Sequence, residues 1–454
     1  MTRITERERR LHRRKRIAIS TVAAVCVVAC VFLAVGSLEQ KQKVNGREPD
    51  DVSAEETAFV SASPQKTASP SPSASPTPKK LADMTAEEIW ENDPRVPIEA
   101  KGIYVSDGSV STEDKLDSLI ALLKKTELNA MVINVKTDDG HVTYDMDIDM
   151  VQEIGAVQPY ITDIGALIKK LKENGIYVIG RVVAFKDPFL AEARPEFSLK
   201  NSDGSIFRDK DGNAWVNPYD RELWDYLVGI GKQMAKDGFD EIQFDYIRFS
   251  TDHGMKQVDF GEEAQSVSKQ EIVNEFVEYA YRALAPTGLF VSADVYGVIV
   301  LYESDGVLIG QDYAGMAKYL DYICPMDYPS HITDGAYDLT DPDTHPYELV
   351  AGLMSDSGRL LSEPNKQGHV AKVRPWLQGF TATWLDNYLE YGPEEFRAQI
   401  DAVYDGGAKE WIFWNAGSHY PEDAFLPSEN EEEIKNGANR DGQNNRSAVS
   451  DTLP

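Results

Sequence analysis

The chain has 454 residues, of which 42% are hydrophobic and 27% are charged, and its formal net charge is −29. This length suits one large domain or two to three ordinary ones, while a surface so acidic repels phosphate backbones and excludes nucleic acid as a partner. The only cysteines are Cys26, Cys30 and Cys324. Because two of them share one apolar run, the sequence excludes both a disulfide scaffold and a thiolate metal cluster.

The N-terminus predicts a membrane anchor. Residues 1–16 form a basic cytoplasmic segment with eight Lys or Arg against two Glu, and residues 17–38 carry no charge. A helix of that length crosses a hydrocarbon core of about 30 Å, and the basic cluster keeps the preceding segment in the cytoplasm. The expected location is therefore the cell membrane, with one transmembrane span and the rest of the chain outside the cell.

Two alternatives to a retained anchor remain. A cleaved signal peptide would make the protein secreted, but no Ala-x-Ala site follows the apolar run. Residues 27–30 loosely resemble a lipoprotein processing site, although apolar residues continue beyond Cys30. The retained anchor is the favoured interpretation.

Low-complexity segments flank the central part of the chain. Residues 39–95 are expected to form a disordered linker, since residues 61–78 are almost entirely Ser, Pro, Ala and Thr. Residues 428–454 are rich in Glu, Asn, Asp and Gly and are expected to form a disordered acidic tail. The remaining residues, 96–427, are expected to form the catalytic domain.

Short apolar runs recur along residues 96–427, each followed by a stretch with helical periodicity. The expected strands are Gly102–Ser106, Ala130–Lys136, Tyr177–Phe185, Glu241–Phe249, Leu289–Tyr296, Tyr322–Tyr328, Val373–Phe380 and Trp411–Asn415. The expected helices include residues 116–123, residues 164–171 with a stop at Asn174-Gly175, a helix that opens at Asn217-Pro218 and ends at Gly238, Glu271–Leu284 and Pro393–Tyr404.

Eight strands alternating with helices predict an α/β fold of the (β/α)8 TIM-barrel type. A doubly wound sheet is the competing fold, but no Gly-rich fingerprint follows the first strand, where Asp107-Gly108-Ser109 forms an ordinary turn. In TIM barrels the chemistry lies at the carboxyl ends of the strands, so the polar residues there are the candidate site.

Carboxylates at these strand ends are suited to glycosidic cleavage, which needs one ionised and one protonated carboxyl group. Alternation places Gln243 and Asp245 on one face of the fourth strand, and Asp245 is the first candidate. Its alternative role is a structural ion pair with Arg248 or Arg181. Asp294 and Asp327 are the candidates for the partner acid, at equivalent depths on strands five and six, with aromatic neighbours that can raise a carboxyl pKa.

Further strand-end residues are candidates for substrate binding. The cations Lys136, Arg181 and Arg248 would hold carboxylates ionised or bind an acidic sugar, and core ion pairing is their alternative role. The Trp residues are candidate sugar platforms or core residues. The remaining candidates are Asp138, Trp215, Gln243, Tyr296, Tyr328, His331, Trp376, Gln378, Trp414 and Asn415.

An ordered set of motifs resembles one known family. The motifs are residues 132–136, Trp215-Val216-Asn217-Pro218, residues 240–249, Ile309-Gly310-Gln311-Asp312, residues 325–331 and residues 374–378. Across about residues 99–425 the chain resembles the putative glycosyl hydrolase domain family, a group of bacterial barrel proteins. The resemblance implies a (β/α)8 fold and a glycosidase activity. It favours Asp294 over Asp327 as general acid, because the residue between Met326 and Tyr328 varies in the family, and it makes Tyr328 a contact to the sugar or the nucleophile.

Other chemistries find little support in the sequence. No pair among the seven histidines has metal-ligand spacing, so we expect no metal site, no cofactor and no zinc deacetylase. Acidic neighbours of Lys136 disfavour a Schiff-base aldolase, and the absence of a Gly-rich loop after strand seven disfavours phosphorylated substrates. The sequence predicts a cell-surface glycoside hydrolase acting on an extracellular or cell-wall polysaccharide, and the alternative is a non-catalytic glycan-binding barrel.

Overall fold

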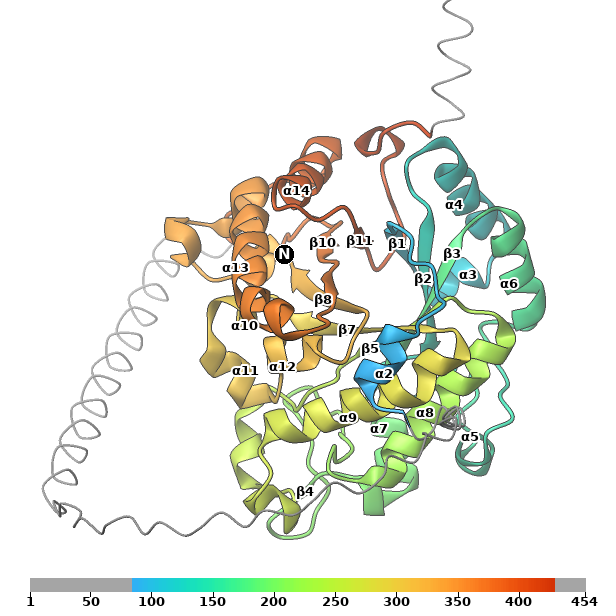
Figure 1. Ribbon diagram of the computed structural model, residues 1–454, viewed down its shortest axis with the longest axis vertical. Coiled ribbons are helices and arrows are strands. Elements are labelled where there is room, and N and C mark those ends of the chain that lie inside the picture. The colour runs from blue at the N-terminus through green and yellow to red at the C-terminus, as the bar shows by residue number, and fades with distance from the viewer. Residues whose placement is uncertain (1–83, 429–454) are drawn as a thin grey trace, which may run out of the picture. The chain divides into compact units, whose positions relative to one another are not determined.

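The computed structural model describes residues 84–428 (Figure 1). The predicted cytoplasmic segment, the anchor at 17–38, most of the linker and almost all of the acidic tail lie outside the described residues. Among residues 84–428 no helix is both long and apolar enough to cross a bilayer.

Within these residues, eight parallel strands close into a barrel, which confirms the predicted fold. The strands are β1 (Lys101–Val105), β2 (Ala130–Lys136), β3 (Tyr177–Val183), β5 (Glu241–Asp245), β7 (Phe290–Tyr296), β8 (Tyr322–Asp327), β10 (Trp376–Gln378) and β11 (Trp411–Trp414). Each pairs with its neighbour in this order, and the pairings of β11 with β1 and of β10 with β8 close the ring. A short strand, β9 (Lys372–Val373), also pairs with β8.

Helices surround the barrel strands, as Figure 1 shows. They are α3 (Asp107–Val110), α4 (Glu113–Lys125), α5 (Asp149–Ile154), α6 (Ile164–Glu173), α7 (Pro188–Ala193), α8 (Arg221–Asp237), α9 (Lys269–Leu284), α10 (Val298–Leu301), α11 (Glu303–Ile309), α12 (Tyr313–Ala317), α13 (Pro346–Gln367) and α14 (Pro393–Asp405). Two short strands in the loops, β4 (Lys200–Asn201) and β6 (Val258–Asp259), pair antiparallel.

Local sequence explains how these helices start, stop and pack. The Asp163 carboxylate accepts a hydrogen bond from the Ala166 backbone N–H and caps α6, whose apolar residues Leu167 and Leu171 are buried. Gly175 ends the helix with a φ of +73°, a conformation that glycine adopts without steric cost. An amphipathic helix of this kind buries one face against the strands.

Several elements differ from the predicted ones, among them β5, which ends at Asp245 and not at Phe249. Helix α8 begins at Arg221, because the carboxylate of Asp220 caps it and Asn217-Pro218 forms the preceding turn. The predicted seventh strand is split into β9 and β10 at Arg374-Pro375. Proline has no N–H to donate to a neighbouring strand. Helix α13 was not predicted, although it covers the gap between β8 and β10.

The barrel interior is filled by side chains in layers, with ionic groups at its lower level. Arg374 and Glu241 form an ion pair that is fully buried, and the hydroxyl of Tyr177 donates to Glu241 at 3.0 Å. Apolar residues such as Cys324 and Trp376 lie above this pair, toward the carboxyl ends of the strands. The interior is therefore packed, and open space is confined to the upper mouth.

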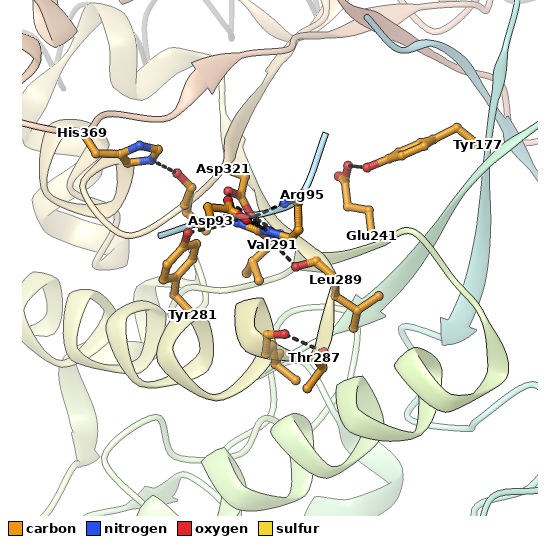
Figure 2. A network of polar contacts seen from close by, with 12 residues as sticks. Asp93, Arg95, Tyr177, Glu241, Tyr281, Thr287, Leu289, Val291, Asp321 and His369 are labelled. Atoms are coloured by element: carbon orange, nitrogen blue, oxygen red, sulfur yellow. Dashed lines mark hydrogen bonds and ion pairs between the residues drawn. The ribbon is translucent and has the colours of Figure 1, made fainter. Parts of the chain in front are cut away.

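The predicted linker was wrong for residues 84–95, which pack against the barrel. Helix α2 (Ala86–Glu91) contacts α9, and the Trp90 ring stacks on His369 at 4.1 Å. Figure 2 shows the side chain of Arg95 reaching the amino-terminal ends of β7 and β8, where its two terminal nitrogens each bind Asp321 at 2.8 Å. Composition alone did not separate this segment from the linker, because a few residues such as Trp90 and Arg95 hold it against the barrel and it contains no long apolar run.

Candidate active site

The upper end of β5 places Asp245 inside the barrel. Glu241, Gln243 and Asp245 alternate with Ile242 and Phe244, and only the first set points into the barrel. In the pairing of β5 with β7, Gln243 lies opposite Ser292. The next inward pair in this register is Asp245 and Asp294, so the two carboxyl groups lie at the same level on neighbouring strands.

A cavity of about 410 Å³ opens at this level. It is lined by Arg181, Asp245, Tyr246, Arg248, Asp294, Tyr296, Gly297, Val298, Met326, Tyr328, His331, Ile332, Trp376 and Trp414. Its position at the carboxyl ends of the strands is the place where TIM barrels carry their active sites. Apolar walls with a few convergent polar groups are typical of a ligand site.

Asp245 is tied to its surroundings through both carboxylate oxygens. Arg181 donates to Oδ2 from Nε at 2.8 Å and from Nη2 at 2.5 Å, and the Tyr246 backbone N–H donates to Oδ1 at 2.6 Å. The ion pair considered as an alternative therefore exists, and it lies within the cavity that also contains a second acid.

The residue that follows Asp245 has an unusual backbone conformation. Tyr246 has a φ of +48°, in the left-handed region that non-glycine residues rarely adopt. Strained residues of this kind are concentrated at functional sites, where the surrounding structure holds them. Here the strain brings the Tyr246 N–H onto the Asp245 carboxylate and its ring into the cavity wall.

Asp294 has a contrasting environment. It is 2% exposed, and the indole N–H of Trp376 donates to Oδ1 at 2.7 Å. Burial, and after it the negative charge of Asp245, raises the pKa of Asp294 well above its usual value. Two neighbouring carboxyl groups with such different environments are suited to one ionised and one protonated role.

Aromatic residues complete the cavity wall. The Trp414 ring stacks on Tyr104 at 4.1 Å and packs edge-to-face against Trp376 at 5.8 Å. Tyr328 is 8% exposed, and burial together with the charges of Asp294 and Asp245 raises the pKa of its hydroxyl. The phenol therefore keeps its proton at neutral pH and can donate a hydrogen bond into the cavity.

Arg248 lies at the edge of the cavity inside a cage of rings. Its guanidinium carbon is 5.2 Å from the ring centre of Trp215, 4.9 Å from that of Tyr246 and 4.4 Å from that of Tyr296. It donates to the Tyr296 hydroxyl at 2.6 Å and to the Phe249 carbonyl at 2.8 Å. Each cation–π contact contributes about 0.5–2 kcal/mol, so the rings hold the cation without neutralising it.

The prediction of Asp327 as a candidate partner acid, at a depth equivalent to that of Asp294, is wrong because the two side chains lie on opposite faces of the barrel wall. In the pairing of β7 with β8, Asp294 lies opposite Cys324 and Tyr296 opposite Met326. The inward positions of β8 are therefore even-numbered, and Asp327 points outward toward the helices with 0% exposure. A shift of one residue in a strand moves a side chain to the opposite face.

Several other candidates lie outside the cavity because other groups occupy their side chains. Lys136 follows an irregularity in β2, pairs with Asp187 at 2.8 Å and donates to the Val183 carbonyl. Gln243 lies one layer below the cavity, against the Cys324 sulfur. Gln378 and Asn415 bind backbone groups and loop residues, and Asp138 pairs with Lys186 at 3.2 Å.

Two hollows flank the cavity. The first, of about 420 Å³, contains Trp215 and shares Tyr246, Arg248 and Tyr296 with it. The second, of about 560 Å³, lies on the loops that follow β8 and β10 and shares His331 and Ile332 with the cavity. Together they extend the open mouth of the barrel to both sides of Asp245 and Asp294.

Sequence reasoning missed Trp384, which stands beside the second hollow. Its ring is 62% exposed, stacks on Phe380 at 5.9 Å and contacts His331 at 6.0 Å. It lies in the loop after β10, beyond the strand ends to which the search was confined. The signal that could have identified it is a Trp in the run Thr381–Asn387, directly after the seventh predicted strand.

Comparison with known protein families gives a match. A family model described as a putative glycosyl hydrolase domain matches residues 102–420. No curated protein sequence is significantly similar to the chain.

Solved structures also resemble the chain. A hypothetical protein from Ruminiclostridium thermocellum is 39% identical over 42% of this chain and 97% of its own, with a TM-score of 0.40. The PgaB (BpsB) glycoside hydrolase domain from Bordetella bronchiseptica is 14% identical over 71% and 95% of the two chains, with a TM-score of 0.49. The spore cortex-lytic enzyme SleL from Bacillus cereus is 11% identical over 72% of each chain, with a TM-score of 0.41.

Proposed function

Since the chain belongs to the putative glycosyl hydrolase domain family, we propose that it hydrolyses glycosidic bonds with Asp245 and Asp294 as its catalytic carboxyl pair. The observation that carries this proposal is the shared cavity of two acids with opposite environments. Asp245 is bound by Arg181, and Asp294 is buried beside an indole N–H. Glycosidic cleavage requires this combination of charged and protonated carboxyl groups.

The roles follow from these environments. Asp294 holds a proton at pH values where an exposed aspartate has lost it, so it acts as the general acid that protonates the leaving oxygen. Asp245 supplies the negative charge opposite the developing oxocarbenium ion. The hydrogen bond from Trp376 to Asp294 fixes the orientation of that carboxyl group.

The substrate is proposed to be a polysaccharide. The two hollows beside the cavity provide room for sugar units on both sides of the cleaved bond. Exposed Trp384 and the cavity-lining Trp414 offer flat apolar surfaces for sugar rings. A monosaccharide glycoside would leave these flanking surfaces unused.

Location is proposed from the sequence alone. The uncharged residues 17–38, after the basic residues 1–16, support a retained anchor with the barrel outside the cell. The enzyme would then act on an extracellular or cell-wall polysaccharide. Protease treatment of intact cells tests this, because an external barrel is digested and an internal one is protected.

A non-catalytic glycan-binding barrel is the second candidate function. The Arg181–Asp245 ion pair favours it, since such a pair can serve structure alone. A binding protein gains nothing, however, from a second carboxyl group buried beside the first at a cost in stability. Asp294 therefore favours the enzyme.

The test is hydrolysis of a panel of α- and β-linked polysaccharides, including peptidoglycan, by the full-length protein. Loss of the general acid should lower the rate by about 10²–10⁴-fold in Asp294→Asn. Asp327→Asn is the matched control, because Asp327 is a buried acid at the top of the neighbouring strand that faces away from the cavity. Cleavage by Asp294→Asn at the wild-type rate, or no cleavage of any glycan by the wild type, would contradict the proposal.

A further inference from the structure

Arg248 is a buried cation without an acidic partner. The other arginines with less than 9% exposure are Arg181 and Arg374, which pair with Asp245 and Glu241. Arg248 is 5% exposed, and it contacts a hydroxyl, a backbone carbonyl and three aromatic rings. Among residues 84–428 no carboxylate forms an ion pair with it.

None of the charged groups in the adjoining hollow forms an ion pair with Arg248. Lys186 pairs with Asp138, and Lys210 is the third cation there. The hollow also contains three carboxylates, those of Asp209, Asp211 and Asp252, and none of them lies within ion-pair distance of Arg248. The carboxylate of Asp209 accepts from the Trp215 indole and from backbone N–H groups, and that of Asp252 accepts from the backbone of Gly254 and Lys210. These two acids are held by their own loops and are directed at N–H donors.

Arg248 lines the cavity without a carboxylate partner. Arg181 and Asp245 pair with each other, and the carboxyl group of Asp294 accepts a hydrogen bond from the neutral indole of Trp376. Arg248 remains as the unpaired cation of a cavity that belongs to a protein of net charge −29. Because charges beyond about 10 Å are screened in salt solution, this local cation decides which groups the cavity attracts.

We propose that Arg248 binds the carboxylate of an acidic sugar in the glycan that occupies the cavity. Arg248 lines both the cavity of Asp245 and Asp294 and the hollow that contains Trp215, so the acidic sugar lies beside the bond to be cleaved. A guanidinium fork matches the planar geometry of a carboxylate, and its apolar cage removes competing water. The inference rests on the proposed function and names the substrate class of that site.

The test measures binding without turnover. Affinities of the full-length protein for D-glucuronate, D-glucose 6-phosphate and D-glucose are compared by ligand-observed NMR. A charge-assisted contact should make glucuronate bind about tenfold more tightly than glucose at low ionic strength, and added salt should reduce that preference. Equal affinities, or a preference for the phosphate over the carboxylate, would overturn the assignment.

Variants connect the preference to Arg248. Arg248→Gln should bind glucuronate no better than glucose, and Arg248→Lys, which keeps the charge but loses the fork, should retain part of the preference. The matched control is Arg221→Gln, since Arg221 also lies over a Trp ring, that of Trp224 at 4.0 Å, but on the exposed side of α8. An unchanged preference in Arg248→Gln would overturn the proposal. If Arg248→Gln does not fold, the lysine variant and the salt dependence of the wild type decide it.

Failure of this inference and failure of the proposed function give different results. If glucuronate binds through Arg248 but no polysaccharide is cleaved, the acidic subsite stands and the hydrolase proposal fails. If polysaccharides are cleaved but acidic and neutral polymers react equally, the hydrolase stands and the acidic subsite fails.

Discussion

Asp245 and Asp294 occupy the same level of two neighbouring parallel strands, yet their hydrogen-bond partners differ in charge. Asp245 accepts two bonds from the Arg181 guanidinium, whereas Asp294 accepts one from the neutral Trp376 indole. One carboxyl group is therefore held by a cation, whereas burial raises the pKa of the other well above its usual value.

Replacing Arg181 should lower both stability and activity. Arg181→Gln leaves Asp245 buried without its charge partner, and such a loss costs about 3–5 kcal/mol of unfolding free energy. Urea denaturation measures the loss, and polysaccharide hydrolysis measures the activity. Arg181→Lys, which keeps a cation, should recover part of both; an Arg181→Gln protein as stable as the wild type would show that the pair contributes little.

Replacing Asp294 should stabilise the protein at neutral pH. Above about pH 4 the unfolded chain releases the Asp294 proton while the folded chain retains it, so the buried carboxyl costs stability that grows as the pH rises toward its folded-state pKa. Asp294→Asn removes this cost and can still accept from Trp376. Its Tm should exceed that of the wild type at pH 7 and match it near about pH 3, where both states hold the proton.

Asp138 is a control for this prediction, because its pKa is shifted in the opposite direction to that of Asp294. Although burial opposes it, the charges of Arg181 and Lys186 lower the pKa of Asp138 in the folded protein. Asp138 therefore contributes stability above the pKa of the unfolded chain, and this contribution is lost as the pH falls. Asp138→Asn should lower the Tm at pH 7. A lower Tm for Asp294→Asn as well would contradict the assignment of a proton to Asp294.

Sequence periodicity located this pair only in part. Alternation along Glu241–Asp245 correctly turned Asp245 into the barrel, because a strand buried on both faces still has a period of two. Placing Asp327 by its depth at the strand end failed, since the direction of its side chain depends on the pairing register of β8 with β7, which only the three-dimensional structure reveals. An error of one residue in the register places an acidic side chain on the outer face of the barrel.

Loops and irregular strand pairing also limited how much of the site could be predicted from the sequence. An irregular pairing between Asn134 and the following residues of β2 turns Lys136 onto Asp187, and no local sequence signal marks such a shift. Trp384 lies in the loop after β10, beyond the predicted strand ends. The predicted strand ends identified the two acids at the base of the cavity, whereas the loop residues around its opening could be placed only from the three-dimensional structure.

Removal of the Trp384 ring should weaken the binding of long substrates and leave the fold intact. The ring is 62% exposed, so little buried surface is lost in Trp384→Ala and the Tm should change by less than about 2 °C. Loss of one stacking platform should raise KM for a polysaccharide about tenfold, since such a contact is worth about 1–2 kcal/mol. Measured KM values that do not change with the substitution would remove Trp384 from the substrate path.

Arg95 should support stability without contributing to catalysis. It binds Asp321 at the amino-terminal end of the barrel, opposite to the cavity, with 5% and 8% side-chain exposure for the two residues. Arg95→Gln should therefore cost about 3–5 kcal/mol of unfolding free energy and leave kcat unchanged. Lys125→Gln is the control, because its exposed pair with Glu422 contributes less than about 1 kcal/mol. Equal losses in the two variants would contradict a structural role for the segment before β1.

The most direct test of the catalytic pair compares two substrates that differ in their leaving group. In a 2,4-dinitrophenyl glycoside the leaving group is dinitrophenolate, which departs without being protonated. In the polysaccharide the leaving group is a sugar oxygen, which needs a proton from the general acid. Asp294→Asn should cleave the aryl glycoside near the wild-type rate and the polysaccharide about 10²–10⁴-fold more slowly, while Asp245→Asn should lose both activities. Wild-type cleavage of the polysaccharide by either variant would contradict the account.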